Sequence, residues 1–365
     1  RRIAQDKAAI KKLALHDETR LFYVASSRAK SHLIYTASPA EKVIASHYFA
    51  GMGLGPETKI QQTESELIKK SLSMDERKEP FIGTKKILRD LVENLTLNPT
   101  SLNNYVSCKR RFLYDDVLML PSAKRTTLIF GNCAHKALEE TYRYYCSKGK
   151  FPDFDFFKNS FKKELCFQGA GESVNLHCTR KLDTLAEWFK KESADPVKPL
   201  GLEDKLYIML DDELSFTGKY DKIEIEDEKR GLLRVVDYKT GKPDDHIKDI
   251  ENNPDISDPE CDGYLRQLAA YKLLYDNSKK RKKGCRISHG VLVFLEPANS
   301  TVKKYGLVEG GFVNKKVFIS DKMVNELRAL IMDCWKRIKR LEFEKLPQRD
   351  DKKCGVCDFD SICWA

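Results

Sequence analysis

The sequence lacks any run of about 18 apolar residues, so we expect no membrane-spanning helix and no membrane partner. Its first residues, RRIAQDKAAIKK, contain no apolar segment of the kind found in signal peptides. No G-x-x-x-x-G-K-[ST] phosphate loop occurs, so we expect no ATP hydrolysis by these residues alone. Because the chain opens on Arg rather than Met, we also expect it to be part of a longer protein.

The density of cysteine is low, with 11 cysteines in 365 residues. Without an export signal, this usage favours a reducing, cytoplasmic compartment over a disulfide framework. Any clustered subset of cysteines is then a candidate for metal ligation.

Positive charge is in excess. Charged residues make up 33% of the chain, and the net charge is +10. An excess of this size fits a polyanionic partner without identifying one.

The stretch from Phe216 to Gly241 reads as two short strands joined by a charged turn. Side chains alternate along a strand, so Asp237 and Lys239 are expected on one side, within reach of Asp221 from the neighbouring strand. Two carboxylates and an ammonium at a sheet edge suit metal-assisted phosphodiester hydrolysis. The alternative is an exposed hairpin whose charged groups are only solvated.

Four short motifs follow one another in a fixed order: Phe130-Gly131-Asn132-Cys133-Ala134-His135, Gly218-Lys219-Tyr220-Asp221, Asp237-Tyr238-Lys239-Thr240-Gly241 and Gln267-x-x-x-Tyr271. This series resembles the GxxxH, GxxD, DYKTG and QxxxY motifs of RecB/AddB-type nucleases of the PD-(D/E)XK superfamily. The resemblance covers about residues 100–365. It implies an α/β fold with a mixed central sheet flanked by helices.

The same resemblance implies the roles of the site residues. His135, Asp221, Asp237 and the Tyr238 carbonyl would hold Mg²⁺ or Mn²⁺. Lys239 would orient the attacking water and offset transition-state charge, and Gln267 and Tyr271 would position the strand. Glu203 stands where some relatives carry a further acidic residue.

The segment Asp17–Lys30, DETRLFYVASSRAK, resembles the last conserved motif of UvrD/PcrA-type helicases, with Ser27 in place of the usual Thr. In that family the arginine matching Arg28 contacts the γ-phosphate of ATP. Residues 1–37 are therefore expected to be the C-terminal remnant of a superfamily 1 helicase domain. ATP would bind only in the full-length parent.

The chain ends with Cys354, Cys357 and Cys363 in C-x₂-C-x₅-C spacing, which lets three thiolates converge on one centre. Zinc is one candidate, because Cys₄ sites commonly bind it. Resemblance to iron–sulfur members of the nuclease family favours a [4Fe–4S] cluster with the remote Cys108 as the fourth ligand.

These observations predict three segments: the helicase remnant 1–37, a helical connector 38–97 and a nuclease domain 98–365. The expected function is a Mg²⁺- or Mn²⁺-dependent deoxyribonuclease acting mainly on single-stranded DNA in double-strand-break repair. Its expected partners are the helicase domains of the same parent chain and a possible second helicase or nuclease subunit, with a cytoplasmic or nucleoid-associated location. The alternative is a non-cleaving module that guides the DNA strand.

Four further expectations are local. Ser101 is expected to cap a helix that runs through Cys108. Lys242–Cys261 reads as a polar loop, and a long helix is expected from Asp321 with Cys334 on its apolar face. The basic cluster Lys279–Lys283 is either solvated or in contact with phosphates.

Overall fold

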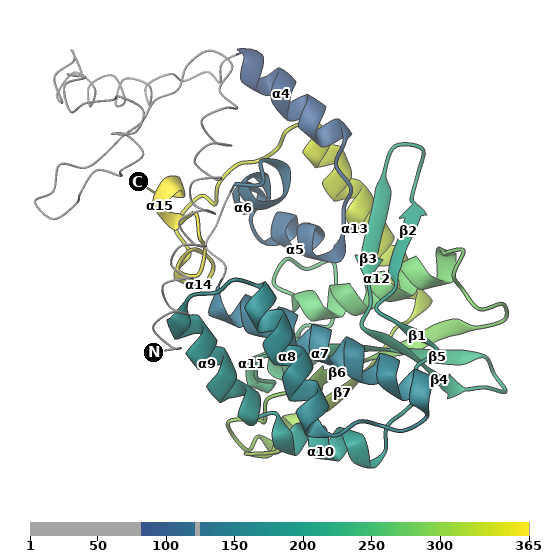
Figure 1. Cartoon of the computed structure of the whole chain (residues 1–365). Coiled ribbons are helices and arrows are strands. Elements are labelled where there is room, and N and C mark those ends of the chain that lie inside the picture. Colours follow the sequence, from purple (N-terminus) through teal and green to yellow (C-terminus); the bar gives the residue numbers. More distant parts are fainter. Residues whose placement is uncertain (1–81, 121–124, 365) are drawn as a thin grey trace, which may run out of the picture. The chain divides into compact units, whose positions relative to one another are not determined.

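The computed structural model describes residues 82–120 and 125–364 (Figure 1). Its centre is a mixed five-stranded sheet in the order β1-β4-β5-β6-β7. The strands are β1 (Gly201–Leu202), β4 (Lys222–Asp227), β5 (Leu232–Lys239), β6 (Arg286–Phe294) and β7 (Asn314–Phe318). β5 and β6 are parallel, and the other neighbouring pairs are antiparallel. A parallel pair needs a long crossover, which two helices supply here.

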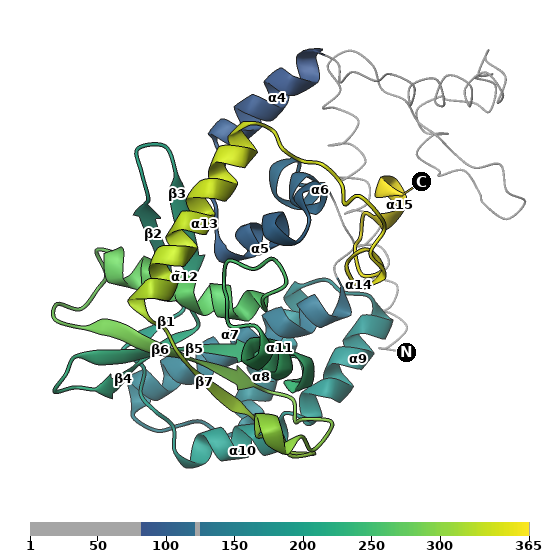
Figure 2. The ribbon, with the colours of Figure 1, turned by 180° about the vertical axis from the view of Figure 1, so that it is seen from behind.

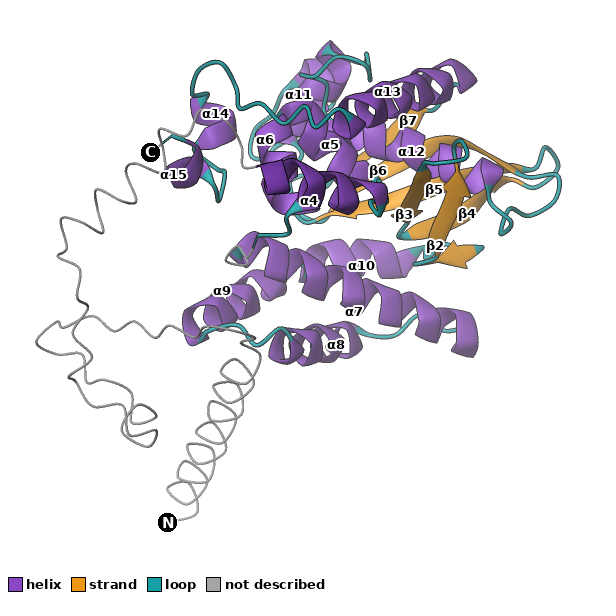
Figure 3. Cartoon of the chain, turned by 90° about the horizontal axis from the view of Figure 1, so that it is seen from above, coloured by secondary structure: helices purple, strands orange, loops and turns teal. Residues whose placement is uncertain are grey.

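One face of the sheet is covered by a layer of four consecutive helices, which Figure 3 shows beneath the strands. They are α7 (Thr126–Lys148), α8 (Phe154–Phe167), α9 (Glu172–Asp183) and α10 (Ala186–Ala194). α8 begins at Asp153, whose side chain accepts a hydrogen bond from the Phe156 backbone N–H. α7 ends at Gly149, which adopts the left-handed conformation that glycine accommodates without strain.

The opposite face is covered by α5, α12 and α13, with α12 and α13 side by side in Figure 2. The helices of this part are α4 (Ile82–Glu93), α5 (Pro99–Ser107), α6 (Lys109–Phe112), a π-helical turn (Leu113–Val117), α11 (Asp244–Asn252), α12 (Gly263–Asn277) and α13 (Asp321–Lys339). A 3₁₀ turn (Lys303–Tyr305) precedes β7, and the C-terminal segment adds α14 (Asp351–Cys354) and α15 (Asp360–Cys363).

The central strand β5 contributes to a hydrophobic core on each of its faces. Leu233 and Val235 pack into the core under α12, and Val236 and Tyr238 pack into the core under α7–α10. This alternation places Asp237 and Lys239 on the α12 side of the sheet. The expected mixed sheet flanked by helices is confirmed.

The stretch from Phe216 to Gly241 contains three strands, so its interpretation as two strands was wrong. β3 (Ser215–Lys219) pairs with β2 (Lys205–Met209) in a separate two-stranded hairpin, and only β4 and β5 pair within the main sheet. Asp221 lies directly between β3 and β4. Its backbone therefore marks the point where the chain passes from the hairpin into the main sheet.

Two other local expectations were wrong. The cap of α5 is Asn98, whose side chain accepts from the Thr100 and Ser101 backbone N–H groups, and Ser101 is the third helical residue of this capping box. The segment expected as a loop contains α11. The long helix α13 begins at Asp321 as expected, and Cys334 is buried in its core-facing stripe.

Two of the motif glycines lie where other parts of the chain come close. A Cβ on Gly131 would lie 3.3 Å from Thr240 Oγ1, just beyond β5. A Cβ on Gly218 would lie 2.6 Å from Cδ1 of Leu274 on α12. The absence of a side chain at both positions lets the elements that carry the candidate site pack closely.

Gly218→Ala is therefore expected to lower the free energy of unfolding by about 1–3 kcal/mol, because the buried Leu274 must move to accept the methyl group. Urea unfolding followed by circular dichroism measures this change. Gly241→Ala is the matched control, because a Cβ there meets no atom within 4 Å. Equal stability of the two variants would contradict the close approach of β3 to α12.

Candidate active site and cysteine pocket

Asp237 and Lys239 lie at the C-terminal end of β5. Lys239 Nζ is 2.5 Å from Asp237 Oδ2, and the two side chains are 11% and 2% exposed. The Lys239 ammonium also lies 3.9 Å from the centre of the Tyr264 ring on α12. Sequence reasoning missed Tyr264, because only the fold places this ring over the lysine.

Asp221 joins the two helix layers at this edge of the sheet. One of its carboxylate oxygens accepts a hydrogen bond from the Tyr238 backbone N–H at 2.7 Å. The other lies 3.1 Å from Nδ1 of His135, which comes from α7 in the opposite layer. The structure therefore brings together His135, Asp221, Asp237 and Lys239 as the motifs predicted.

The ionisable groups of the site strongly influence one another. Burial opposes the charge of His135, but the charge of Asp221 and their hydrogen bond outweigh it and raise the His135 pKa to about 9. Burial also opposes the charge of Asp221, whose pKa is nevertheless lowered by His135 and by the Tyr238 N–H. Burial and the like charge of Asp221 raise the pKa of Asp237, even beside Lys239. A cation bound between the two carboxylates would relieve this repulsion.

Gln267 and Tyr271 lie one helical turn apart on α12 and face the same site. Lys239 Nζ donates to Gln267 Oε1 at 2.7 Å, and Gln267 Nε2 donates to the Tyr271 hydroxyl at 2.6 Å. The Tyr271 hydroxyl in turn donates to Asp237 Oδ1 at 3.2 Å. The two α12 side chains thus hold both the lysine and the carboxylate in place.

Glu203 completes the group. His135, Glu203 and Asp221 each offer one ligand atom, and these atoms all lie within 4.8 Å of one another. Glu203 follows β1 with a φ of 54°, a left-handed conformation that is uncommon for a residue with a side chain. Burial and the charge of Asp221 raise its pKa to about 6, although Lys219 forms an ion pair with it. Glu203 therefore has the position and the electrostatics of a further metal ligand.

Glu203→Gln is expected to weaken Mn²⁺ binding about tenfold, because the amide keeps the shape of the side chain but not its charge. Isothermal titration of Mn²⁺ into the protein measures the change. Glu139→Gln on α7 is the control, because the ion-pair partners of Glu139 among the described residues are Lys136 and Arg143. Unchanged Mn²⁺ affinity in the Glu203 variant would remove Glu203 from the ligand set.

A family model described as the PD-(D/E)XK nuclease superfamily matches residues 96–364. The chain belongs to this superfamily. Among solved structures, the chain is similar to the crystal structure of SSO0001, with a TM-score of 0.33 and 14% identity over 78% of this chain and 97% of that chain. It is also similar to a putative exonuclease from Eubacterium rectale, with a TM-score of 0.43 and 13% identity over 79% and 94%. No curated protein matches the chain. In the described part, none of the helices has the length and apolarity needed to cross a bilayer.

PD-(D/E)XK nucleases use divalent metal ions, and the donors of this site fit one. Asp237 Oδ2 is buried and makes no hydrogen bond, although Lys239 lies beside it as an ion-pair partner. The N–H and C=O of a strand residue point to the same edge, so the Tyr238 carbonyl faces Asp221 as its N–H does. Carboxylate and carbonyl oxygens with one imidazole suit Mg²⁺ or Mn²⁺.

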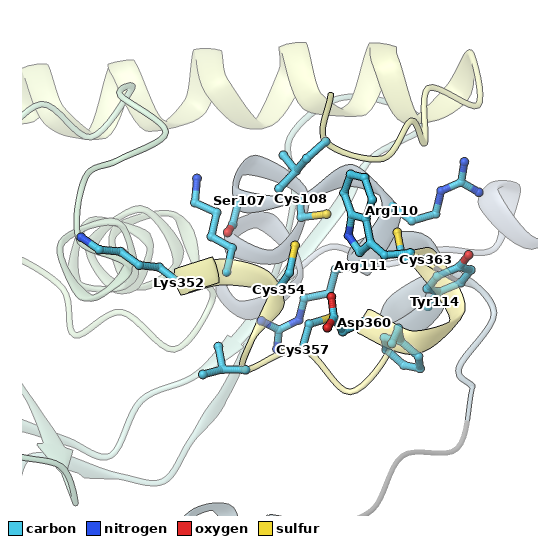
Figure 4. Close-up of a pocket in the computed structure, with 15 residues that line it drawn as sticks. Ser107, Cys108, Arg110, Arg111, Tyr114, Lys352, Cys354, Cys357, Asp360 and Cys363 are labelled. Atoms are coloured by element: carbon cyan, nitrogen blue, oxygen red, sulfur yellow. The ribbon is translucent and has the colours of Figure 1, made fainter. Parts of the chain in front are cut away.

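The four cysteines expected to act together line one pocket of about 210 Å³ (Figure 4). Cys108 lies at the end of α5, Cys354 ends α14, Cys357 follows it and Cys363 ends α15. Burial and the nearby Cys108 raise the pKa values of Cys357 and Cys363. The pocket therefore joins the first helix of the nuclease domain to the C-terminal segment.

The remaining sequence expectations lie outside the described residues. These are Arg28, the helicase remnant 1–37 and most of the connector 38–97.

Proposed function

We propose that the chain is a metal-dependent nuclease that hydrolyses the phosphodiester bonds of single-stranded DNA. The observation that carries this proposal is the convergence of Asp221, Asp237 and Lys239 with His135 at one sheet edge, in a chain of the PD-(D/E)XK superfamily. The alternative of a non-cleaving strand guide has less support, because no member of this set is replaced.

Mg²⁺ or Mn²⁺ would be held by His135, Asp221, Asp237, Glu203 and the Tyr238 carbonyl, and it would activate water and neutralise phosphate charge. Lys239 is positioned to orient that water and to stabilise negative charge on the phosphate in the transition state. Gln267 fixes the lysine by accepting its hydrogen bond. Tyr271 fixes the carboxylate of Asp237 by donating a hydrogen bond to it. These two α12 side chains therefore hold the lysine and the carboxylate in their relative positions.

We further propose that the cysteine pocket holds a [4Fe–4S] cluster. In the described residues no three of the cysteine sulfurs lie within 4.8 Å of one another, unlike the ligand atoms of the His135 group. Four thiolates around one zinc ion would lie only about 3.8 Å apart, given a Zn–S bond of about 2.3 Å. No such compact set of three sulfurs occurs among the described residues, and this finding, with a pocket of about 210 Å³, favours the larger cluster.

The helicase-like motif that contains Arg28 supports a parent protein in which a motor delivers the strand to this domain for break processing. ATP would act only in that parent. This part of the proposal rests on sequence resemblance.

The direct test incubates the purified chain with end-labelled single-stranded and duplex DNA in Mn²⁺, in Mg²⁺ and in EDTA. We expect cleavage of the single strand with either ion and none in EDTA. Binding of the strand without cleavage under any of these conditions would favour the guiding module instead.

A further inference from the structure

A groove lies between the β2–β3 hairpin and the helices α12 and α13, on the part of the fold that stands away from the main sheet in Figure 1. It has a volume of about 650 Å³. We call it the hairpin groove, and the side chains that line it include Lys205, Tyr207, Met209, Lys279, Lys280 and Arg328.

All charged side chains that line the hairpin groove are basic: Lys205, Lys279, Lys280 and Arg328. Within the described residues, Lys205 and Lys279 have no ion-pair partner, and Lys280 pairs with the half-exposed Asp204 at 2.8 Å. Arg328 donates to the Leu210 carbonyl at 3.0 Å and so ties α13 to the hairpin. The groove therefore presents positive charge that the protein itself leaves largely unneutralised.

Two apolar side chains accompany this charge on the same face of β2. Tyr207 is 57% exposed and Met209 is 50% exposed, while Leu206 and Ile208, which alternate with them along β2, are buried. An exposed aromatic ring among lysines suits a strand of nucleic acid, because bases stack on the ring while phosphates contact the ammonium groups. An acidic polypeptide would use the charges but would not need the ring.

The hairpin groove begins close to the metal-binding group. Lys205 follows Glu203 by two positions, a distance of about 7 Å along an extended chain. Lys205 is opposite Lys219 in the hairpin, and Lys219 pairs with Glu203. On the other wall, α12 carries Gln267 and Tyr271 at the site and Asn277 at the groove.

We propose that the hairpin groove binds the single strand of nucleic acid beyond the segment held at the active site, with Lys205, Lys279 and Lys280 on phosphates and Tyr207 under a base. This inference rests on the proposed nuclease function and adds a second contact region to it. It implies that long strands bind more tightly than short ones.

The test measures binding of a long thymidine polymer by fluorescence anisotropy in EDTA, over a range of salt concentrations. The variant combines Lys205→Gln, Lys279→Gln and Lys280→Gln. We expect its affinity to fall about tenfold and the slope of log K against log[salt] to become shallower by about 2, since each phosphate contact on a single strand contributes about 0.7. Cleavage of a short oligomer in Mn²⁺ should stay unchanged.

The control combines Lys148→Gln, Lys150→Gln and Lys190→Gln, which remove the same total charge. These exposed residues lie on α7, just beyond α7 and on α10, respectively. It should keep the wild-type salt slope. Tyr207→Ala should weaken binding of the long polymer about tenfold, and Tyr207→Phe should restore it, because stacking needs only the ring.

An unchanged salt slope in the groove variant, with normal cleavage of the short oligomer, would exclude strand binding at the hairpin groove. The proposed nuclease function would not be affected by that result. A wild-type chain that neither binds nor cleaves a single strand would overturn both. If labelled polyglutamate binds the wild type and not the groove variant, while both bind the thymidine polymer equally, the groove serves an acidic protein segment and the proposal is overturned.

Discussion

Asp237→Asn is expected to lower the rate of single-strand cleavage roughly a thousandfold, because a metal ion contributes several kcal/mol to transition-state stabilisation and Asp237 holds it. The amide of asparagine keeps the shape of the side chain but lacks the negative charge that a divalent ion needs from this ligand. The measurement is the single-turnover cleavage rate in saturating Mn²⁺. Lys239→Met should have an effect of similar size, since it removes the ammonium group that lies beside that carboxylate.

The thermal stability of Asp237→Asn distinguishes a loss of catalysis from a loss of folding. Burial and the Asp221 charge raise the pKa of Asp237. A raised carboxyl pKa means that the ionised form destabilises the fold, and this cost appears as pH rises through the folded-state pKa. Asp237→Asn should therefore unfold at the same temperature as the wild type or a higher one at neutral pH. Asp245→Asn, at an exposed position on α11, is the control and should change neither property. Full cleavage by the Asp237 variant would exclude the proposed site.

The residues at the reacting centre could be predicted because short-range patterns encode them. Alternation along β5 fixes Asp237 and Lys239 on one face, and the i, i+4 spacing on α12 fixes Gln267 and Tyr271 on another. These relations hold wherever the strand and the helix lie. The reason for Gly218 is of another kind, because a Cβ there would meet Leu274 on the distant helix α12.

The features that local patterns do not encode depend on contacts between distant segments. Glu203 was suggested only by the family resemblance. It reaches His135 and Asp221 because a left-handed turn follows β1, and local propensity gives no reason for a glutamate to adopt it. β3 reads as the neighbour of β4 in sequence, but its register pairs it with β2. The hairpin groove exists only through that pairing, so neither the sequence of β2 nor the basic cluster Lys279–Lys283 alone revealed it.

Cys108→Ser is expected to remove iron from the protein and to lower its thermal stability together. Wild-type protein purified without oxygen should be brown and contain about four irons per chain. Cys108 comes from α5, whereas Cys354, Cys357 and Cys363 come from the C-terminal segment. Metal analysis and a thermal melt on the same samples measure both effects. Cys166→Ser is the control, because Cys166 is exposed on α8 and does not line the cysteine pocket.

The size of this effect follows from the length of chain that the four thiolates would close. A link between residues 108 and 363 encloses nearly the whole nuclease domain, and closing so long a loop restrains the unfolded chain by several kcal/mol if the disulfide model applies. The chain directly after α13 has its own contacts with α5 and α6, since Phe343 packs on Phe112 and Glu344 pairs with Lys109. Around α14 and α15 the contacts are with other elements: Phe359 packs on Tyr114, and Arg125 pairs with Asp358. In Cys108→Ser we therefore expect α14 and α15 to detach on heating before the sheet unfolds. One zinc and no iron in the wild type would overturn the cluster, and an unchanged melt in the variant would overturn its role in joining the two ends of the domain.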